Sequence, residues 1–141
     1  MKRGLTRIGN RIGAWMYRGL DGRLVSTKSA HVLLLTVPGR RTGLPRSTCV
    51  RYLETADGLL VWGTASGSPK DPDWFRNLRA TQSAEVQLDA RHLQVHPREL
   101  TGEERNHAWT HVILAAAPAV ARYATRAGRT IPVALLEPIP G

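Results

Sequence analysis

The chain has 141 residues, 42% of them hydrophobic and 22% charged, which suits one globular domain with a single core. It holds no run of about 18 apolar residues, which argues against a membrane-spanning helix, and its only cysteine, Cys49, excludes an internal disulfide and favours a reducing cytoplasm. The net charge of +9 is concentrated in residues 1–28, with seven basic residues against one acid, and in residues 39–51, with four arginines and no acid, so we expect anionic partners at two places.

The first predicted element is a basic amphipathic helix over residues 5–19. Its apolar residues fall on one stripe, and they are Leu5, Ile8, Ile12 and Trp15. Two interpretations remain open for it. The helix packs on the rest of the chain with its arginines solvated, or it lies on an anionic membrane with Trp15 and Tyr17 at the interface. Residues 1–28 are interpreted as this helix and a connector, and residues 29–141 as the remainder of a single domain.

The next stretch has the pattern of β-strands. Residues 32–37 are a short apolar run that Pro38 and Gly39 end, which predicts a buried strand. Residues 46–54 are rich in Thr, Val and Tyr and predict a second strand. Residues 59–64 follow the Asp57-Gly58 turn, so these two segments predict a hairpin.

Small residues, Gly and Pro predict a loop over residues 63–72. A short helix follows to Ala80, with Pro72 at its first position and Asp71 as its cap. Residues 86–95 alternate apolar and polar side chains around Asp89-Ala90, which predicts a second hairpin with one solvated face.

The last third of the chain predicts two helices and a strand. Thr101 and Glu104 have the spacing of a capping box, so a helix begins at Thr101 and runs to about Ala116. A second helix begins at Pro118 and ends at Gly128, and residues 131–136 form a last strand. This gives about six strands with no regular βαβ unit, which favours a mostly β (α+β) fold, a small antiparallel barrel with peripheral helices.

The segment Gly39–Arg46, Gly-Arg-Arg-Thr-Gly-Leu-Pro-Arg, has the composition of an anion-binding turn. Its glycines permit tight backbone geometry, and its backbone N–H groups could form an anion nest. Its arginines can donate bidentate hydrogen bonds to phosphate oxygens, and Thr42 adds a hydroxyl. The alternative from the residues alone is a solvated basic hairpin.

Four stretches together carry a resemblance to a known family. They are Ala14-Trp15-Met16-Tyr17-Arg18 with Asp21-Gly22; Leu33-Leu34-Leu35-Thr36 with Gly39-Arg40-Arg41-Thr42-Gly43 and Pro45-Arg46; Lys70-Asp71-Pro72-Asp73-Trp74 with Asn77-Leu78; and Tyr123 with Arg129-Thr130-Ile131-Pro132-Val133. In this order and at these spacings, nearly the whole chain resembles the deazaflavin (coenzyme F420)-dependent nitroreductase and quinone reductase family. That resemblance implies a split β-barrel, FMN-binding-like, over residues 29–141. Split barrels of this kind often pair as dimers, so it also makes a homodimer an expectation.

The resemblance also implies roles for individual residues. The turn would bind the phosphate and tail of F420, the strand end after Trp62 would contact the deazaflavin ring, and the helix after Pro72 would border the cofactor. The cofactor-binding residues expected on this basis are Arg40, Arg41, Thr42, Gly43, Pro45, Arg46, Gly63, Thr64, Ala65, Lys70, Trp74 and Asn77. Lys70 is included because Ala65-Ser66-Gly67 stands where family members often have Lys or Asn before Gly-Gly, and Lys70 could replace that basic contact.

On the substrate side, the resemblance implies contacts from Tyr123, Tyr17 and Val120. Relatives active on bulky nitroaromatics carry extra tyrosines where this chain has Ala117 and Val120, which argues against nitroreductase activity. The implied activity is hydride transfer from reduced F420 to a quinone-like, enone or nitro acceptor. No catalytic acid is identified. A hydroxyl of Thr64 or Tyr123, or a backbone N–H, could meet charge that develops on the acceptor oxygen.

The residues also suggest two other functions and a metal site. A split-barrel protein could bind FMN, the runner-up cofactor, or sequester F420 without reducing anything. The charge alone suggests nucleic-acid binding, but only Tyr52 lies near the arginines of residues 40–46, so no nucleic acid is expected. His107 and His111 have the i, i+4 spacing of metal ligands, but His-Glu-x-x-His is missing, so no metal is expected.

The resemblance also bears on where the protein works, because family members that reduce quinones act at the membrane surface. The expected location is therefore the cytoplasm, with reversible attachment of residues 1–22 to the inner face of the cell membrane.

Overall fold

A computed structural model describes residues 31–140, and the predicted helix over residues 5–19, with Tyr17, lies outside the described residues. Within the described part, seven strands form one sheet in the order β2-β1-β5-β6-β7-β4-β3, and every neighbouring pair is antiparallel. The strands are β1 (Val32–Pro38), β2 (Pro45–Arg51), β3 (Leu53–Thr55), β4 (Gly58–Trp62), β5 (Ala84–Leu88), β6 (Arg91–Glu99) and β7 (Val133–Pro138). The helical elements are η1 (Ala65–Gly67), α2 (Asp73–Arg79), α3 (Gly102–His107), η2 (Ala108–Ile113), α4 (Leu114–Ala116) and α5 (Val120–Ala127).

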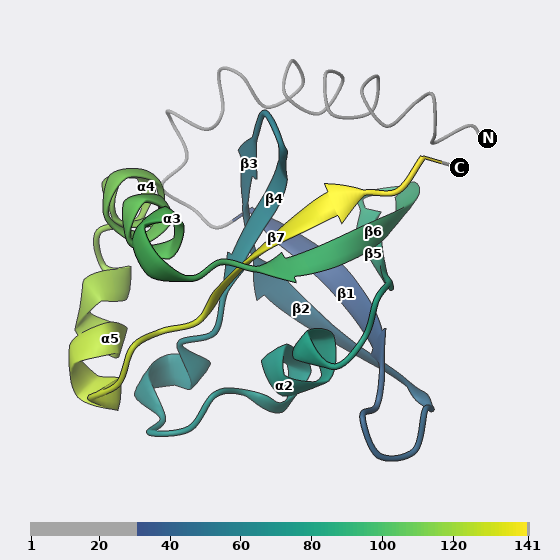
Figure 1. Ribbon diagram of the computed structural model, residues 1–141, viewed down its shortest axis with the longest axis horizontal. Coiled ribbons are helices and arrows are strands. Elements are labelled where there is room, and N and C mark those ends of the chain that lie inside the picture. The colour runs from purple at the N-terminus through teal and green to yellow at the C-terminus, as the bar shows by residue number, and fades with distance from the viewer. Residues whose placement is uncertain (1–30, 141) are drawn as a thin grey trace.

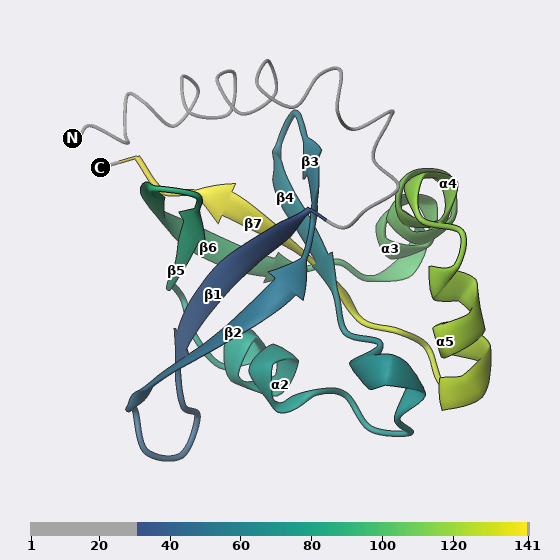
Figure 2. The same ribbon diagram turned by 180° about the vertical axis from the view of Figure 1, so that it is seen from behind.

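The sheet curls because its two edge strands are consecutive in the chain. Only Tyr52 separates β2, at one edge, from β3, at the other, and its N–H donates to the carbonyl of His31 at 3.0 Å. The sheet must therefore bend until its edges meet, and Figures 1 and 2 show the resulting half-barrel with the helices outside it. The predicted split barrel is confirmed. The strand expected over residues 46–54 divides at Tyr52, which accounts for seven strands where about six were expected.

Apolar side chains fill the barrel interior, and on β4 they fill both faces of the strand. On β1, Leu33, Leu35 and Val37 are buried in the barrel interior, and the residues between them are partly exposed, as an alternating strand requires. All five residues of β4 are buried, because Leu59 and Val61 face the interior while Leu60 and Trp62 face a second core under the helices. The barrel interior is thus filled by strand side chains together with Phe75 and Leu78 of α2, and residues 102–127 cover the second core.

One predicted helix cap is wrong, and a second lacks its predicted side-chain bonds. Pro72, not Asp71, is the N-cap of α2, with no side-chain cap, because the Asp71 carboxylate accepts hydrogen bonds from Arg129 and Arg79 instead. Thr101 is the extended N-cap of α3 but makes no side-chain cap bond, and Glu104 pairs with Arg98 at 2.9 and 3.0 Å.

Both predicted C-terminal helices are present. The first spans residues 102–116 and contains a π-helical segment, η2; within it Ala108 and Ile113 are buried. The second, α5, ends at Gly128 in the left-handed conformation, with φ +65°. Among residues 31–140, the helices are all too short or too polar to cross a lipid bilayer.

Candidate functional site

The turn between β1 and β2 is held by its own backbone. The Gly39 N–H donates to the Leu44 carbonyl and the Gly43 N–H donates to the Gly39 carbonyl, each at 2.8 Å. Gly43 has φ +76°, which favours glycine, and the Thr42 Oγ1 accepts from the Leu44 N–H at 3.2 Å. These bonds fix the backbone from which the side chains of Arg41 and Arg46 project, and both residues are exposed.

Asn77 on α2 anchors this turn from the opposite side. Its Oδ1 accepts two hydrogen bonds from Arg40, at 3.0 Å from the backbone N–H and at 2.7 Å from the guanidinium. The Asn77 side chain is almost fully buried, with 7% of its residue exposed, so this link lies partly inside the protein. Arg40 also donates to Asp73 at 3.3 Å. The turn and α2, 37 residues apart in sequence, are thereby fixed relative to each other.

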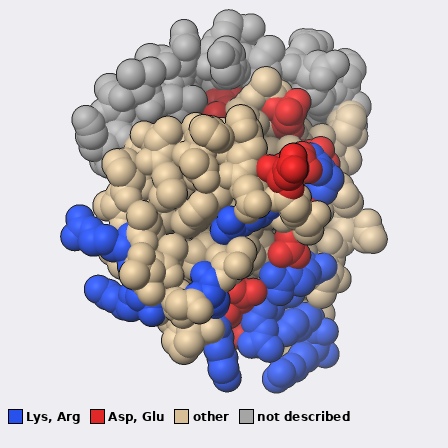
Figure 3. All heavy atoms as spheres, turned by 60° about the vertical axis from the view of Figure 1, so that its left-hand side comes forward, with Lys and Arg blue, Asp and Glu red and all other residues tan. Residues whose placement is uncertain are grey.

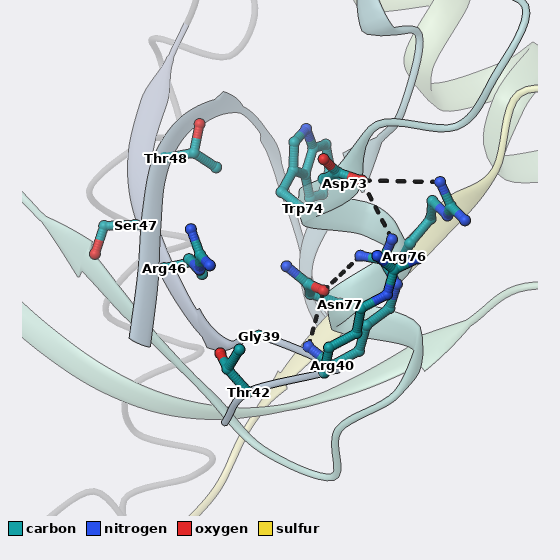
Figure 4. A pocket seen from close by; sticks show the side chains of 11 residues that line it. Gly39, Arg40, Thr42, Arg46, Ser47, Thr48, Asp73, Trp74, Arg76 and Asn77 are labelled. Carbon is teal, nitrogen blue, oxygen red and sulfur yellow. Dashed lines mark hydrogen bonds and ion pairs between the residues drawn. The ribbon is translucent and has the colours of Figure 1, made fainter. Parts of the chain in front are cut away.

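A cavity of about 650 Å³ lies between this turn, β2 and α2. Figure 4 shows Ser47 and Thr48 of β2 on one side, Trp74 and Asn77 of α2 on the other, and Arg46 between them. Its full lining is Gly39, Arg40, Arg41, Thr42, Arg46, Ser47, Thr48, Asp73, Trp74, Arg76 and Asn77. The structure therefore brings together six of the twelve residues predicted to bind the cofactor, namely Arg40, Arg41, Thr42, Arg46, Trp74 and Asn77.

The cavity carries more positive charge than its own acid neutralises. Asp73 pairs with Arg40 at 3.3 Å and lies 3.8 Å from Arg76. Within residues 31–140, neither Arg41 nor Arg46 makes an ion pair, and both residues are exposed. On the face drawn in Figure 3, most Lys and Arg side chains also lie in the lower half. Such a cavity is suited to a ligand with a phosphate or several carboxylates.

The other predicted cofactor residues do not line this cavity. Gly43 and Pro45 face a smaller recess of about 240 Å³ on the other side of the turn. Gly63, Thr64, Ala65 and Lys70 belong to the loop that joins β4 to α2. The two ends of that loop lie against each other, because a Cβ at Gly63 would stand 3.0 Å from the Pro72 ring.

The loop between β4 and α2 has an unusual backbone. Ala65, Ser66 and Gly67 have φ of 49°, 54° and 89°, a conformation that costs energy in residues other than glycine. Helix α5 packs on this segment, and a Cβ at Gly67 would stand 2.6 Å from the Arg126 Cδ. Strained backbone of this kind is frequent in ligand sites, and here it follows the strand end predicted to contact the ring.

The predicted substrate-contacting residues have different surroundings. Tyr123 on α5 is 39% exposed, and the Arg126 guanidinium lies 5.8 Å from the centre of its ring. Arg126 also covers Gly67, so α5, the helix that carries Tyr123, borders the strained loop. Val120 is only 1% exposed and packs with Ile113 in the second core, so it offers a substrate no surface in this structure.

Comparison with known proteins decides the family of the chain. Residues 9–138 match the family of F420H(2)-dependent quinone reductases. The chain belongs to this family. It is 29% identical over 125 residues to the F420H(2)-dependent quinone reductase Rv1261c of Mycobacterium tuberculosis strain H37Rv, a match that covers 86% of the chain and 84% of that protein. The family is one of oxidoreductases, and it implies coenzyme F420 as the cofactor.

Solved structures agree with this assignment. An F420-H2-dependent reductase, FDR-A, superimposes with a TM-score of 0.67 at 32% identity, over 76% of this chain and 94% of that chain. A domain-swapped dimer superimposes with a TM-score of 0.68 at 28% identity, over 88% and 98% of the two chains. The haem storage protein HutZ of Vibrio cholerae, at 14% identity and a TM-score of 0.58 over 87% of this chain and 90% of that chain, shares the fold alone.

Several residues that line the cavity were not predicted from the sequence. Ser47, Thr48, Asp73 and Arg76 line the cavity without having been predicted to bind the cofactor. Arg76 lies one residue before Asn77 on the same helix, so its position beside the cavity follows once α2 is placed. Ser47 and Thr48 were predicted to lie in a strand but could not be assigned to the cavity, because that depends on which β2 side chains face α2.

Two groups of titratable residues lie away from the cavity. Glu54 on β3 is 4% exposed, its carboxylate oxygens have no hydrogen-bond partner among the described residues, and burial raises its pKa to about 7. The rings of His107 and His111 lie 4.8 Å apart. Among residues 31–140, no three His, Cys, Asp or Glu side chains are grouped so that they could hold a metal.

Proposed function

We propose that this chain oxidises reduced F420 and delivers the hydride to a quinone-like acceptor. The observation that carries the proposal is the cationic cavity between the β1–β2 turn and α2, in a chain of this family. The curated relative from M. tuberculosis is named as a quinone reductase, which makes a quinone the first acceptor to test. Enones and nitro compounds are narrower alternatives for the same site.

The turn is proposed to hold the phosphate of the cofactor. Arg41 and Arg46 have guanidinium groups that no acid neutralises within residues 31–140, and each can donate two parallel hydrogen bonds to a phosphate. Arg40 has a different role, because its guanidinium already donates hydrogen bonds to Asn77 and Asp73. We assign Arg40 to fixing the turn, and Arg41, Thr42 and Arg46 to contact with the anion.

The residues beside the cavity fit the rest of such a cofactor. When bound, reduced deazaflavin supplies the hydride itself, so the protein has only to orient the ring and exclude competing reactions. Trp74 is half-buried at the cavity wall and presents an apolar surface for a ring system. The backbone of Gly63, Thr64 and Ala65 is proposed to border the ring, and Lys70, exposed on the same loop, to supply a basic contact.

The acceptor is proposed to approach from the side of α5. Tyr123 is exposed on that helix, and Arg126 connects it to the loop that carries Thr64. The hydroxyl groups of Tyr123 and Thr64 are the two candidates for donating a hydrogen bond to the acceptor oxygen. Tyr17 is proposed as a further contact, but it lies outside the described residues.

Two further properties are proposed from sequence and family. Residues 1–22 attach to an anionic membrane surface, supported by their excess of basic residues. Sedimentation with anionic liposomes tests this, since deletion of residues 1–22 should abolish binding and unchanged binding would contradict it. A homodimer is supported by the similarity to a domain-swapped dimer, and light scattering tests it: the mass of a monomer would contradict it.

A binding titration tests the cofactor against its runner-up. Oxidised F420 and FMN are added separately to the full chain, and ligand fluorescence is followed. We expect saturable binding of F420 and binding of FMN that is at least about tenfold weaker, because F420 has a charged tail beyond its phosphate that the arginines of the turn can also contact, whereas FMN ends at its phosphate. Tight binding of FMN without binding of F420 would overturn the proposal.

A further inference from the structure

The loop of residues 63–71 encloses one arginine side chain. Its ends meet where Gly63 packs against Pro72, and Figures 1 and 2 show it between α2 and α5, beside the segment that leads into β7. That segment begins with Arg129, directly after the left-handed Gly128 that ends α5. The side chain of Arg129 is only 15% exposed.

Arg129 bonds to the loop at five positions. Its Nε donates to the Ser68 carbonyl at 3.0 Å, and its Nη1 donates to the Asp71 carboxylate at 2.6 Å. Its Nη2 lies within hydrogen-bond distance of three carbonyls, those of Gly63 at 3.1 Å, Thr64 at 3.2 Å and Lys70 at 3.0 Å. The carbonyls that face into the loop are thus satisfied by one side chain 58 to 66 residues further along the chain.

A second arginine holds the far end of this network. Asp71 also accepts from the Arg79 Nη2 at 3.2 Å, and Arg79 makes two bonds to the Glu99 carboxylate, at 2.7 and 3.0 Å. Glu99 is the last residue of β6, so the chain of ion pairs connects the loop to the sheet. The loop therefore cannot shift without breaking charge-assisted hydrogen bonds.

We propose that Arg129 is a positioning residue for the reductase site, which holds the backbone of Gly63–Ala65 where it borders the ring of the cofactor. This inference rests on the proposed function. Arg129 donates no bond to the phosphate turn, and it acts through the loop, since its donors point to carbonyls and to Asp71. Ala65 and Ser66 keep positive φ because the ends of the loop are held on both sides, by Arg129 within and by α5 outside.

Lysine cannot replace Arg129 in this role. The guanidinium is planar and directs five N–H groups into one plane, whereas an ammonium has three donors around one point. Arg129→Lys keeps the charge beside Asp71 but cannot reach the carbonyls at both ends of the loop. Arg105→Lys is the matched control, because Arg105 also donates its Nε and Nη2 to a carbonyl, that of Ile131, outside the loop.

The test compares two ligands that share the ring. One is oxidised F420, and the other is the deazaflavin chromophore with its ribityl chain but no phosphate. Dissociation constants are measured by fluorescence titration on full-length protein, at temperatures below the melting temperature of each variant. We expect Arg129→Lys to raise the dissociation constants of both ligands by the same factor, about tenfold, which is equivalent to one lost charge-assisted hydrogen bond. Arg105→Lys should leave both affinities unchanged.

The outcomes separate this inference from the proposed function. Arg129→Lys protein that binds the phosphate-free chromophore as tightly as wild type, or wild type that binds F420 but not that chromophore, would overturn the positioning role alone. Wild type that binds neither ligand would overturn the proposed function and the inference with it. If Arg129→Lys does not fold, Asp71→Asn replaces it, with an equal loss for both ligands expected and unchanged affinities contradicting the role.

Discussion

The backbone N–H and the guanidinium of Arg40 donate to the same atom, the Oδ1 of Asn77, at 3.0 and 2.7 Å. One buried carboxamide thus fixes both the main chain of the β1–β2 turn and the direction of its first arginine. This arrangement frees Arg41 and Arg46 for a ligand, because Arg40 is already committed to the fold. It also fixes the β1–β2 turn, one wall of the cavity, to α2. Removal of the Asn77 side chain should therefore lower both the stability of the protein and its affinity for a ligand in the cavity.

Asn77→Ala should lower the free energy of unfolding by about 1–3 kcal/mol, because the N–H and guanidinium of Arg40 lose a partly buried acceptor. Urea unfolding measures this change, and F420 affinity should fall in the same variant. Asn106→Ala is the control, since Asn106 is exposed and accepts from its neighbour Arg105, and it should change stability by less than about 0.5 kcal/mol. Equal stabilities for the two variants would contradict the anchoring role.

Arg41→Ala and Arg46→Ala should each weaken F420 binding about tenfold or more, since each removes a bidentate contact to the phosphate. The loss of affinity should shrink as salt is added, because salt screens the attraction that each arginine supplies in the wild-type protein. Fluorescence titration at several salt concentrations measures both effects. Arg91→Ala removes an exposed arginine from the β5–β6 hairpin, away from the cavity, and should leave F420 affinity unchanged. If all three variants behave alike, the turn has no specific role.

Gly67→Ala should destabilise the protein more than Gly43→Ala, although both glycines have positive φ. A Cβ at Gly43 would meet nothing within 4 Å, so that change costs only the backbone strain, about 1 kcal/mol. A Cβ at Gly67 would stand 2.6 Å from the Arg126 Cδ and force α5 from the loop, which adds about 1–3 kcal/mol. Thermal unfolding of both variants checks the order, and a smaller loss for Gly67→Ala would contradict the packing of α5.

Glu54 should make stability depend on pH. Burial raises its pKa from the ordinary value of 4.5 to about 7, so the folded state binds the proton more tightly than the unfolded state does. The stabilisation is complete below pH 4.5, falls as the pH rises toward 7, and is lost above it. Glu54→Gln stays neutral, so its advantage over wild type in urea unfolding should grow from about pH 5 to about pH 8. A constant difference across this range would show that Glu54 ionises normally.

Much of the fold follows from local sequence patterns. The run Val32–Pro38, the Asp57-Gly58 turn and the Asp89-Ala90 turn are specified by nearby residues, and all lie where the patterns predict. The break at Tyr52 is not local, because it depends on β2 and β3 belonging to opposite edges of the curled sheet. The cap expected at Asp71 failed for a related reason, because Arg129, 58 residues further along the chain, binds the Asp71 carboxylate. Glu104 instead pairs with Arg98, six residues before it on the adjoining strand, so Thr101 caps its helix without the reciprocal side-chain bonds.

The site shows the same division. The turn around Arg41 is a compact motif, and the sequence alone shows that its composition suits anion binding. Arg129 stands in a stretch that resembles the family, yet no pattern shows that its guanidinium enters a loop some 60 residues earlier. Val120 was expected at the substrate side from the resemblance alone, and its burial in the second core depends on how α5 packs, which no local pattern shows.

The most direct test of the proposed activity is oxidation of reduced F420 in the presence of a menaquinone analogue. It is followed by the return of oxidised F420 fluorescence, with enones and nitroimidazoles as further acceptors. We predict turnover that needs both protein and quinone, that saturates with each, and that Arg41→Ala lowers at subsaturating F420 through weaker cofactor binding. Protein that binds reduced F420 tightly yet oxidises it no faster than buffer with any of these acceptors would contradict a reductase and identify a carrier of F420.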